Sequence, residues 1–234
     1  MKRPAFAFDV SLTLDSRKME QPDLIPFQAD TPGISGRAVP PFFAESGPIT
    51  SVIFGEAPGP RGADRSGIPF WGDGAGLPLY RALERAGCAH IPDQAWEPWE
   101  GSRLIAAGLR PTLSGVALSN AFPRCPTNDG RRFRAPSRTE LHSAENLTRL
   151  ENELRAAMLR GAVQVVTLGR CAGDVLAPLA EKLALRLLAL PHPSAQGLLS
   201  DAPNRGKGQR LADLQTAWEE RLAAALCNQP TDHL

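Results

Sequence analysis

The 234-residue sequence lacks a long apolar run, an excess of charge of either sign and any closely spaced pair of cysteines. No segment approaches the roughly 20 apolar residues that a membrane-spanning helix needs, and the N-terminus has no apolar run long enough for a signal peptide. We therefore expect a cytoplasmic protein, with no membrane as partner and a monomer as the default state.

The four cysteines, Cys88, Cys125, Cys171 and Cys227, are far apart and form no Cys-x-x-Cys pair. This spacing argues against a compact metal site and against a disulfide framework. We expect reduced thiols, no bound metal and no cofactor.

The charges nearly cancel, with 26 Lys and Arg against 25 Asp and Glu. A net charge of +1 excludes a global basic field of the kind that draws nucleic acid to a whole surface, so any such surface must be local. The basic side chains are almost all arginine. Arginine is the better bidentate phosphate ligand, but a GC-rich genome produces the same bias.

Residues 1–48 hold seven of the 22 prolines and five of the nine phenylalanines. Proline at this density interrupts regular structure, whereas phenylalanine packs against a core. We expect residues 1–48 to form an irregular arm packed on the domain, with a short helix near Asp15–Met19. The domain itself should span 49–228, followed by a C-terminal tail at 229–234.

From residue 50 onward, short apolar runs alternate with helical stretches. This alternation predicts βα units around a buried parallel sheet, and hence an α/β fold, a three-layer α/β/α sandwich with a central four-stranded parallel sheet. The expected strands are 50–55, 115–120, 163–169 and 185–191, and the expected helices are 77–87, 138–160, 170–183 and 210–226. Ser137 and Glu140 form a capping signal at the start of the second helix.

Polar residues follow the predicted strands. Glu56 opens a glycine-rich loop over residues 55–76, Asn120 ends the second strand and His192 follows the fourth. Ligands of open α/β sheets bind outside the carboxyl ends of the strands, so we expect these three side chains to line one cavity. Each also has a plainer interpretation, as a loop carboxylate, a turn asparagine or a structural histidine.

Two loops at the same edge carry basic residues. Phosphate is the natural partner of such a cluster, although an ordinary solvated arginine loop is the alternative. The DNA-binding candidates are Arg124, Arg131 and Arg132 in one loop and Arg205 and Lys207 in the other.

The motifs resemble those of the uracil-DNA glycosylase superfamily. They are Gly-Glu-Ala-Pro-Gly at 55–59, Gly-Ile-Pro-Phe at 67–70, Gly-Ala-Gly at 74–76 and His-Pro-Ser at 192–194. The resemblance covers about residues 50–215. The first and third motifs are similar to the thermophile-type iron-sulfur branch, and the spacing up to Phe70 is similar to the single-strand-selective branch.

The resemblance implies a role for each matching residue. Glu56 would orient or activate the attacking water, and His192 would donate a hydrogen bond to the base oxygen. Phe70 would stack on the extruded base and Asn120 would bind its Watson-Crick edge. Backbone amides near Ala57 and Ser194 would add donors, and the exposed pair Leu198 and Leu199 would be the wedge that fills the gap in the duplex. Phenylalanine after proline is more often a core residue than a stacking platform, and Leu198 and Leu199 are equally compatible with simple packing.

Some features depart from the iron-sulfur branch. Residues 1–87 contain no cysteine, and Cys125 resembles only one cluster ligand where four are needed, so we predict no iron-sulfur cluster. Of an acidic pair in that branch only Asp64 remains. No lysine lies in the first motif, which favours a monofunctional enzyme that leaves an abasic site.

The expected function is therefore removal of uracil or another deaminated base from DNA. Two alternatives stay open: a nucleic-acid-binding protein of the same fold with weak or no turnover, and a small-molecule α/β enzyme that binds a nucleotide at this edge.

Overall fold

The structure is a computed structural model that describes residues 33–227. Its central sheet contains four parallel strands in the order β5-β2-β6-β7, with β1 antiparallel beside β5. The bounds of these strands are Phe42–Phe43 for β1, Ile49–Gly55 for β2, Gly115–Asn120 for β5, Gln164–Leu168 for β6 and Arg186–Leu190 for β7. The predicted α/β fold is confirmed, with five strands in the sheet rather than four.

The additional strand comes from the segment that we expected to be an irregular arm. Phe42 and Phe43 pair with Leu118 and Ala117 of β5. The preceding prolines do not prevent this, because an edge strand leaves one side of its backbone unpaired. The expected helix at 15–19 and the rest of the arm up to residue 32 lie outside the described residues, as does the C-terminal tail.

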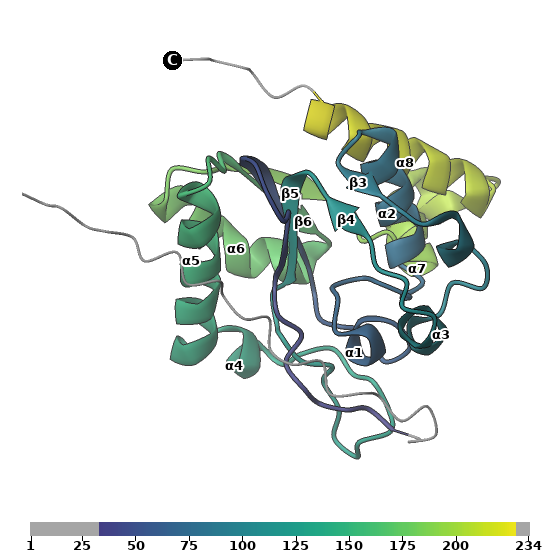
Figure 1. Cartoon of the computed structure of the whole chain (residues 1–234), viewed down its shortest axis with the longest axis horizontal. Coiled ribbons are helices and arrows are strands. Elements are labelled where there is room, and N and C mark those ends of the chain that lie inside the picture. Colours follow the sequence, from purple (N-terminus) through teal and green to yellow (C-terminus); the bar gives the residue numbers. More distant parts are fainter. Residues whose placement is uncertain (1–32, 228–234) are drawn as a thin grey trace, which may run out of the picture.

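Helices cover both faces of the sheet (Figure 1). α5 (Ala144–Met158) and α6 (Arg170–Lys182) pack on one face, and α2 (Gly76–Arg85) packs with α8 (Leu211–Cys227) on the other. The three-layer arrangement that we predicted is therefore present.

The predicted helix at 138–160 is in fact two helices, α4 (Arg138–Leu141) and α5. Ser137 and Glu140 form the expected capping box of α4. Ser143 then accepts a hydrogen bond from the backbone N–H of Asn146 and starts α5. A second N-cap serine so soon after the first starts a separate helix.

Several short elements were not predicted, because each is too short to show a helix or strand period. They are α1 (Ala63–Ser66), β3 (Ala89–His90), the 3₁₀ turn η1 (Asp93–Ala95), α3 (Gly101–Ala106), β4 (Thr112–Leu113), α7 (Ala195–Asp201) and η2 (Pro203–Gly206). β3 and β4 pair as an antiparallel hairpin around η1 and α3. This is the structure of residues 89–113, for which the sequence offered no account.

The strands β2, β5 and β6 are buried almost throughout, as strands covered on both faces should be. Between residues 33 and 227, none of the helices has both the length and the apolar character that crossing a membrane requires.

The carboxylate of Asp73, a half-buried residue, links two parts of the glycine-rich loop. Asp73 accepts hydrogen bonds from the backbone N–H groups of Gly59 (3.2 Å) and Ala63 (3.1 Å). A Cβ atom at Gly59 would lie 2.1 Å from the Asp73 carboxylate, so only glycine fits there. Burial raises the pKa of Asp73 from 3.8 to about 6, against the opposing effect of the backbone hydrogen bonds.

This pKa shift predicts how stability depends on pH. The folded protein holds the Asp73 proton more tightly than the unfolded chain does, so the stabilising contribution is complete below about pH 4 and is lost as the pH rises through about 6. Asp73→Asn should flatten the fall in the free energy of unfolding across this window, as measured by urea unfolding from about pH 4 to 7. The exposed Asp93→Asn is the control, and a wild-type pH dependence in Asp73→Asn would contradict the prediction.

Candidate active site

The strand register brings the predicted residues to one edge of the sheet. Gly55 of β2 pairs with Asn120 of β5, and Leu168 of β6 pairs with Leu190 of β7. The order β5-β2-β6-β7 reverses the direction of chain connection between β2 and β6. Such a switch point leaves a crevice outside the carboxyl ends of the strands, where ligands of this fold class bind.

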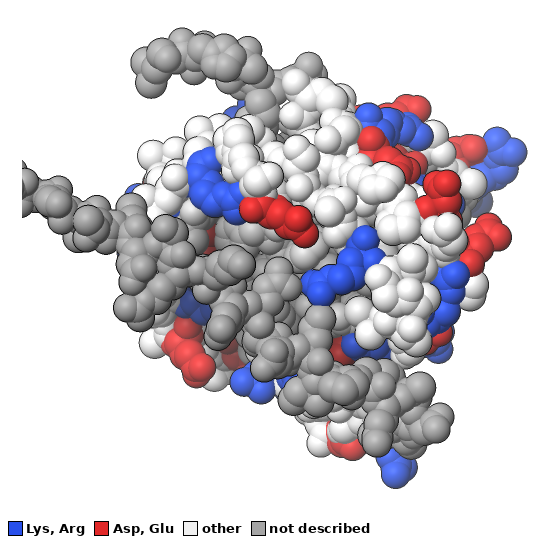
Figure 2. All heavy atoms as spheres, viewed as in Figure 1, with Lys and Arg blue, Asp and Glu red and all other residues white. Residues whose placement is uncertain are grey.

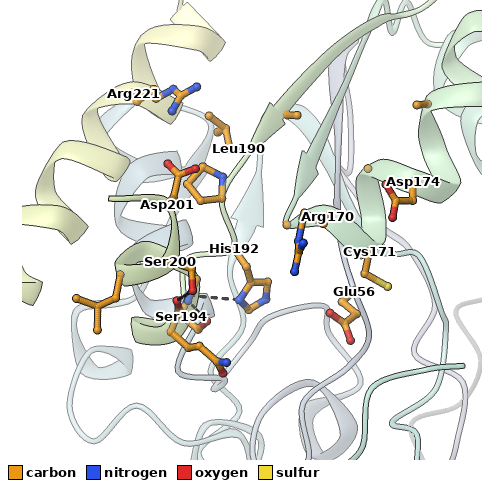
Figure 3. A pocket seen from close by; sticks show the side chains of 18 of the residues that line it. Glu56, Arg170, Cys171, Asp174, Leu190, His192, Ser194, Ser200, Asp201 and Arg221 are labelled. Atoms are coloured by element: carbon orange, nitrogen blue, oxygen red, sulfur yellow. Dashed lines mark hydrogen bonds between the residues drawn. The ribbon is translucent and has the colours of Figure 1, made fainter. Parts of the chain in front are cut away.

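An open groove of about 1460 Å³ lies at this edge. Glu56 and His192 both line it, and Figure 3 shows their side chains facing the same hollow with Arg170 between them. The other predicted residues on its wall are Ser194, Leu199 and Arg205. A carboxylate and an imidazole therefore share one solvent-accessible cavity.

His192 is held in a defined position and protonation state. The backbone N–H of Ser194 donates to Nδ1 of His192 at 3.3 Å, so in the neutral ring the proton is on Nε2. Burial lowers the pKa of His192 and favours this neutral form. Trp218 also donates from its indole to the carbonyl of Pro191 at 2.9 Å, which fixes the chain immediately before the histidine. His192 can thus act as a neutral hydrogen-bond donor.

Glycines leave the room that His192 needs. A Cβ atom at Gly169 would lie 3.1 Å from Cβ of His192, and one at Gly197 would lie 2.2 Å from the His192 carbonyl oxygen. Gly169 also has a φ of 89°, which a residue with a side chain rarely adopts.

Glu56 follows β2 and is half-buried. The backbone N–H groups of Ala121 and Phe122 donate to the carbonyls of Gly55 (2.8 Å) and Glu56 (2.9 Å), so the chain leaving β5 fixes the start of the loop. Burial raises the pKa of the Glu56 carboxyl above its ordinary value. Below neutral pH this group is therefore protonated more readily than an exposed glutamate.

Phe70 and Asn120 are not among the residues that line the groove, contrary to the expectation that Asn120 would share it with Glu56 and His192. Their exposed fractions are 4% and 3%. Both lie against Gly55: a Cβ atom there would be 2.6 Å from Cζ of Phe70 and 2.9 Å from Oδ1 of Asn120. The two side chains thus approach the same point at Gly55, next to Glu56, and neither is on the groove wall.

The amide of Asn120 is also unusual in its hydrogen bonding. Within the described part of the chain, its buried Nδ2 atom has no hydrogen-bond partner. A buried donor without a partner costs free energy and is compensated when a ligand supplies an acceptor.

The backbone around Phe70 is held by aromatic side chains. Phe70 has a φ of 64°, which is costly for a residue with a side chain. On either side of it, Tyr80 donates to the carbonyl of Pro69 at 2.9 Å and Trp99 donates to that of Asp73 at 2.7 Å. Trp71 packs edge-to-face on Tyr80 and Trp99 and donates to Leu109 at 3.1 Å. Residues 89–113 therefore support the loop that carries Phe70.

The structure contradicts part of the prediction that Leu198 and Leu199 form an exposed wedge. Leu198 is 4% exposed and belongs to the hydrophobic core, because α7 turns it inward, so its expected exposure is wrong. Leu199 lines the groove and stays a candidate. The amide of Ser194 is already bonded to His192, which removes it as a free donor, and Ala57 is half-buried outside the groove lining.

The basic loop after β5 is less free than its sequence suggests. Arg134 forms two hydrogen bonds of 2.7 Å with Glu140 and is neutralised by it. Arg124 donates to the carbonyl of Gly36 at 3.1 Å. Arg131 and Arg132 are exposed and bond the carboxylate of Asp129 only through their backbone N–H groups, so their guanidinium groups extend outward.

On the face drawn in Figure 2, basic and acidic side chains are interspersed, with no continuous positive field among the described residues. Lys207 is exposed beside η2, and Arg205 is exposed on the groove wall.

Several side chains on the groove wall were not predicted from the sequence, namely Arg170, Cys171, Asp174, Ser200 and Arg221. Arg170 is the first residue of α6 and directly follows Gly169 at the end of β6. Its position at a strand-to-helix junction was a signal that could have identified it. The others depend on how α6, α7 and α8 face one another, which no local pattern shows.

The four cysteines are not gathered at a single site in the described part of the chain. Within residues 33–227, no group of three or more His, Cys, Asp or Glu side chains could hold a metal ion. Burial raises the pKa of Cys125 and of Cys171 to about 12, so both are protonated thiols at neutral pH.

Comparison with known proteins identifies a family for this chain. The family model of the Uracil DNA glycosylase superfamily matches residues 46–220, more than half of the chain. A Type-5 uracil-DNA glycosylase of Thermus thermophilus is 32% identical over 125 residues, which cover 53% of this chain. The chain spans only about half of that relative (48%).

A solution NMR structure from Methanosarcina acetivorans, described provisionally as a uracil DNA glycosylase, aligns with 81% of this chain and 97% of its own. The TM-score is 0.47 and the identity 15%, values too low to support a conclusion about this chain.

The contact of Phe70 and Asn120 at Gly55 gives a direct prediction. Gly55→Ala should push both side chains aside and lower the free energy of unfolding by about 1–3 kcal/mol, the usual cost of overpacking a core. Urea unfolding measures this cost. Gly74→Ala is the matched control, because a Cβ atom there meets nothing within 4 Å. Equal stability of the two variants would contradict the prediction.

Proposed function

The chain belongs to the uracil-DNA glycosylase superfamily, and on this basis we propose that it is a monofunctional DNA glycosylase. Its substrate is uracil or another deaminated base in DNA, and it hydrolyses the N-glycosidic bond in base excision repair. The observation that carries this proposal is the shared groove of Glu56 and a neutral His192 at the carboxyl ends of the sheet. We include a cytoplasmic location and a monomeric state in the same proposal.

The chemistry needs opposite electrostatic partners at two ends of the breaking bond. Positive charge develops on the sugar and negative charge on the departing base, so an anion is needed near one and a preorganised donor near the other. The Glu56 carboxylate stabilises the sugar and orients the attacking water. His192 donates from Nε2 to the base oxygen, as its tautomer and its lowered pKa permit.

In this proposal Phe70 and Asn120 recognise the base. Both are buried in the free protein, so the loop that carries Phe70 must shift when an extruded base enters beside Gly55. Stacking on Phe70 then offsets part of the cost of extrusion, about a few kcal/mol. The unpartnered Nδ2 of Asn120 gains an acceptor on the base.

DNA is held by the basic residues around the groove. Arg170 and Arg205 on its wall, with the exposed Arg131, Arg132 and Lys207 nearby, provide phosphate contacts, and Arg124 takes part at the edge of the same loop. Leu199 is the remaining candidate for the residue that fills the gap left by the base.

A second candidate function is DNA binding without turnover. The observation that favours it is the burial of Phe70 and Asn120, which would leave the groove without its base-recognition surface if the loop did not open. A nucleotide-binding small-molecule enzyme finds no comparable support in the groove.

An oligonucleotide assay separates these functions. Single- and double-stranded DNA carrying uracil, hypoxanthine or xanthine is incubated with the protein and treated with alkali to cleave abasic sites. We expect cleavage at one or more of these bases, and a loss of at least about a hundredfold in rate for His192→Ala and for Glu56→Gln. His142→Ala, which changes an exposed histidine, is the control. Binding of every lesion without cleavage would establish the second candidate.

The pH dependence of the rate tests the assignment of Glu56. Its pKa is raised, so the carboxylate is lost on acidification sooner than in an exposed glutamate, whereas the lowered pKa of His192 moves protonation of the imidazole to more acid pH. Single-turnover rates should therefore fall toward acid pH along a limb that belongs to Glu56. That limb should persist in His192→Ala and disappear in Glu56→Gln, and its survival in Glu56→Gln would contradict the role of Glu56.

A further inference from the structure

A buried polar network packs against the chain at Asn120, one of the two residues proposed to recognise the base. It is built by three residues on one face of α5, Asn146, Arg149 and Glu153, which contact the carboxyl end of β5. Asn146 and Glu153 are only 5% and 8% exposed, and the side chain of Arg149 is 23% exposed. Neither the groove nor the proposed chemistry uses these residues.

The network forms hydrogen bonds with the backbone carbonyls of Asn120 and Ala121 and with the side chain of Ser119. Arg149 donates to the carbonyl of Asn120 and to that of Ala121, each at 3.0 Å. Asn146 donates to Ala121 as well, at 2.9 Å. Ser119, the residue before Asn120, donates from its hydroxyl to Glu153 at 2.7 Å.

The ion pair completes the arrangement. Arg149 and Glu153 approach to 2.5 Å, and Arg149 also donates to Oδ1 of Asn146. Three successive residues of the chain, 119–121, are thereby fixed by one helix face. A buried ion pair contributes little to stability compared with apolar residues of similar volume, so stability alone gives no reason for it here.

The orientation of the Asn120 side chain depends on these hydrogen bonds. Its Nδ2 atom has no partner within residues 33–227, so no hydrogen bond from Nδ2 orients the amide. Its position follows from the backbone at 119–121 and from packing against Gly55 and Phe70. Uracil presents an N–H donor beside an oxygen acceptor, so a displaced or rotated amide would lose both hydrogen bonds.

We propose that Asn146, Arg149 and Glu153 are positioning residues that fix the amide of Asn120 for base recognition. The proposal rests on the proposed glycosylase function, because it concerns the same site. The network acts through the backbone of residues 119–121 and does not touch the base. Its loss should slow base release more than it weakens the binding of DNA, whose phosphate contacts lie elsewhere.

α5 supplies a matched control. Arg155 and Glu151 form an ion pair at 2.7 Å, four residues apart as in the buried pair, but the side chain of Arg155 is 55% exposed and contacts no residue of the site. Arg149→Met and Arg155→Met thus remove the same charge from the same helix. Arg149→Lys keeps the charge but loses the planar guanidinium, which bonds Asn146 from Nε, Glu153 from Nη1 and the carbonyls of residues 120 and 121 from Nη2.

The experiment measures single-turnover rate and DNA affinity for the full-length chain on a uracil oligonucleotide. We expect Arg149→Met to lower the rate on the order of tenfold to a hundredfold with less than about a threefold change in Kd, since small misplacements have effects of this size. Arg149→Lys should recover stability without recovering the rate, and Arg155→Met should match wild type. Equal rates for Arg149→Met and Arg155→Met would overturn the proposal.

A second readout does not depend on turnover. The side-chain amide resonances of Asn120, assigned in a ¹⁵N-labelled protein with Asn120→Asp as the reference, should shift or broaden in Arg149→Met and stay unchanged in Arg155→Met. If the wild type proves inactive, this comparison still tests the positioning role. If Arg149→Met does not fold, Ser119→Ala removes a single hydrogen bond to Glu153 and takes its place. An unmoved Asn120 amide in every folded variant of the network would overturn the proposal.

Discussion

The pairing of β2 between β5 and β6 is the constraint on which the site depends. All three strands run parallel, so the residues that end or follow them reach one edge together. Gly55 faces Asn120 across this pairing, and the hydrogen bonds from Ala121 and Phe122 extend it by two residues past the strand. Glu56 is the first residue after β2, and its carbonyl accepts the last of these hydrogen bonds, which fixes its place at the groove.

The absence of side chains is as important as their presence around this edge. Gly55 admits the ring of Phe70 and the amide of Asn120, Gly59 admits the carboxylate of Asp73, and Gly169 with Gly197 admits His192. A Cβ atom would collide with a functional or supporting group at Gly55, Gly59 and Gly197, and at Gly169 it would make a tight contact with His192. The glycine-rich character of the loops therefore reflects close packing at the site rather than freedom of the chain.

Support for the site also comes from side chains that do not line the groove. The hairpin region 89–113 holds the strained backbone at Phe70 through Trp99 and Leu109, and α8 holds the chain before His192 through Trp218. α5 holds the chain at Asn120 through Arg149. Each of these contacts is a hydrogen bond to a backbone carbonyl, which fixes a position without placing another polar group in the cavity.

Local sequence was enough to define the α/β class, the four parallel strands and the edge at which Glu56, Asn120 and His192 gather, because apolar periodicity and loop composition are local properties. It did not reveal β1, the break between α4 and α5, or the short elements of 89–113, which have too few residues for a period. Only the packed chain establishes that Leu198 is core, that Arg134 is neutralised by Glu140, and that Phe70 and Asn120 lie behind Gly55. Burial and long-range contacts arise only when distant segments pack together, and no local pattern of residues encodes them.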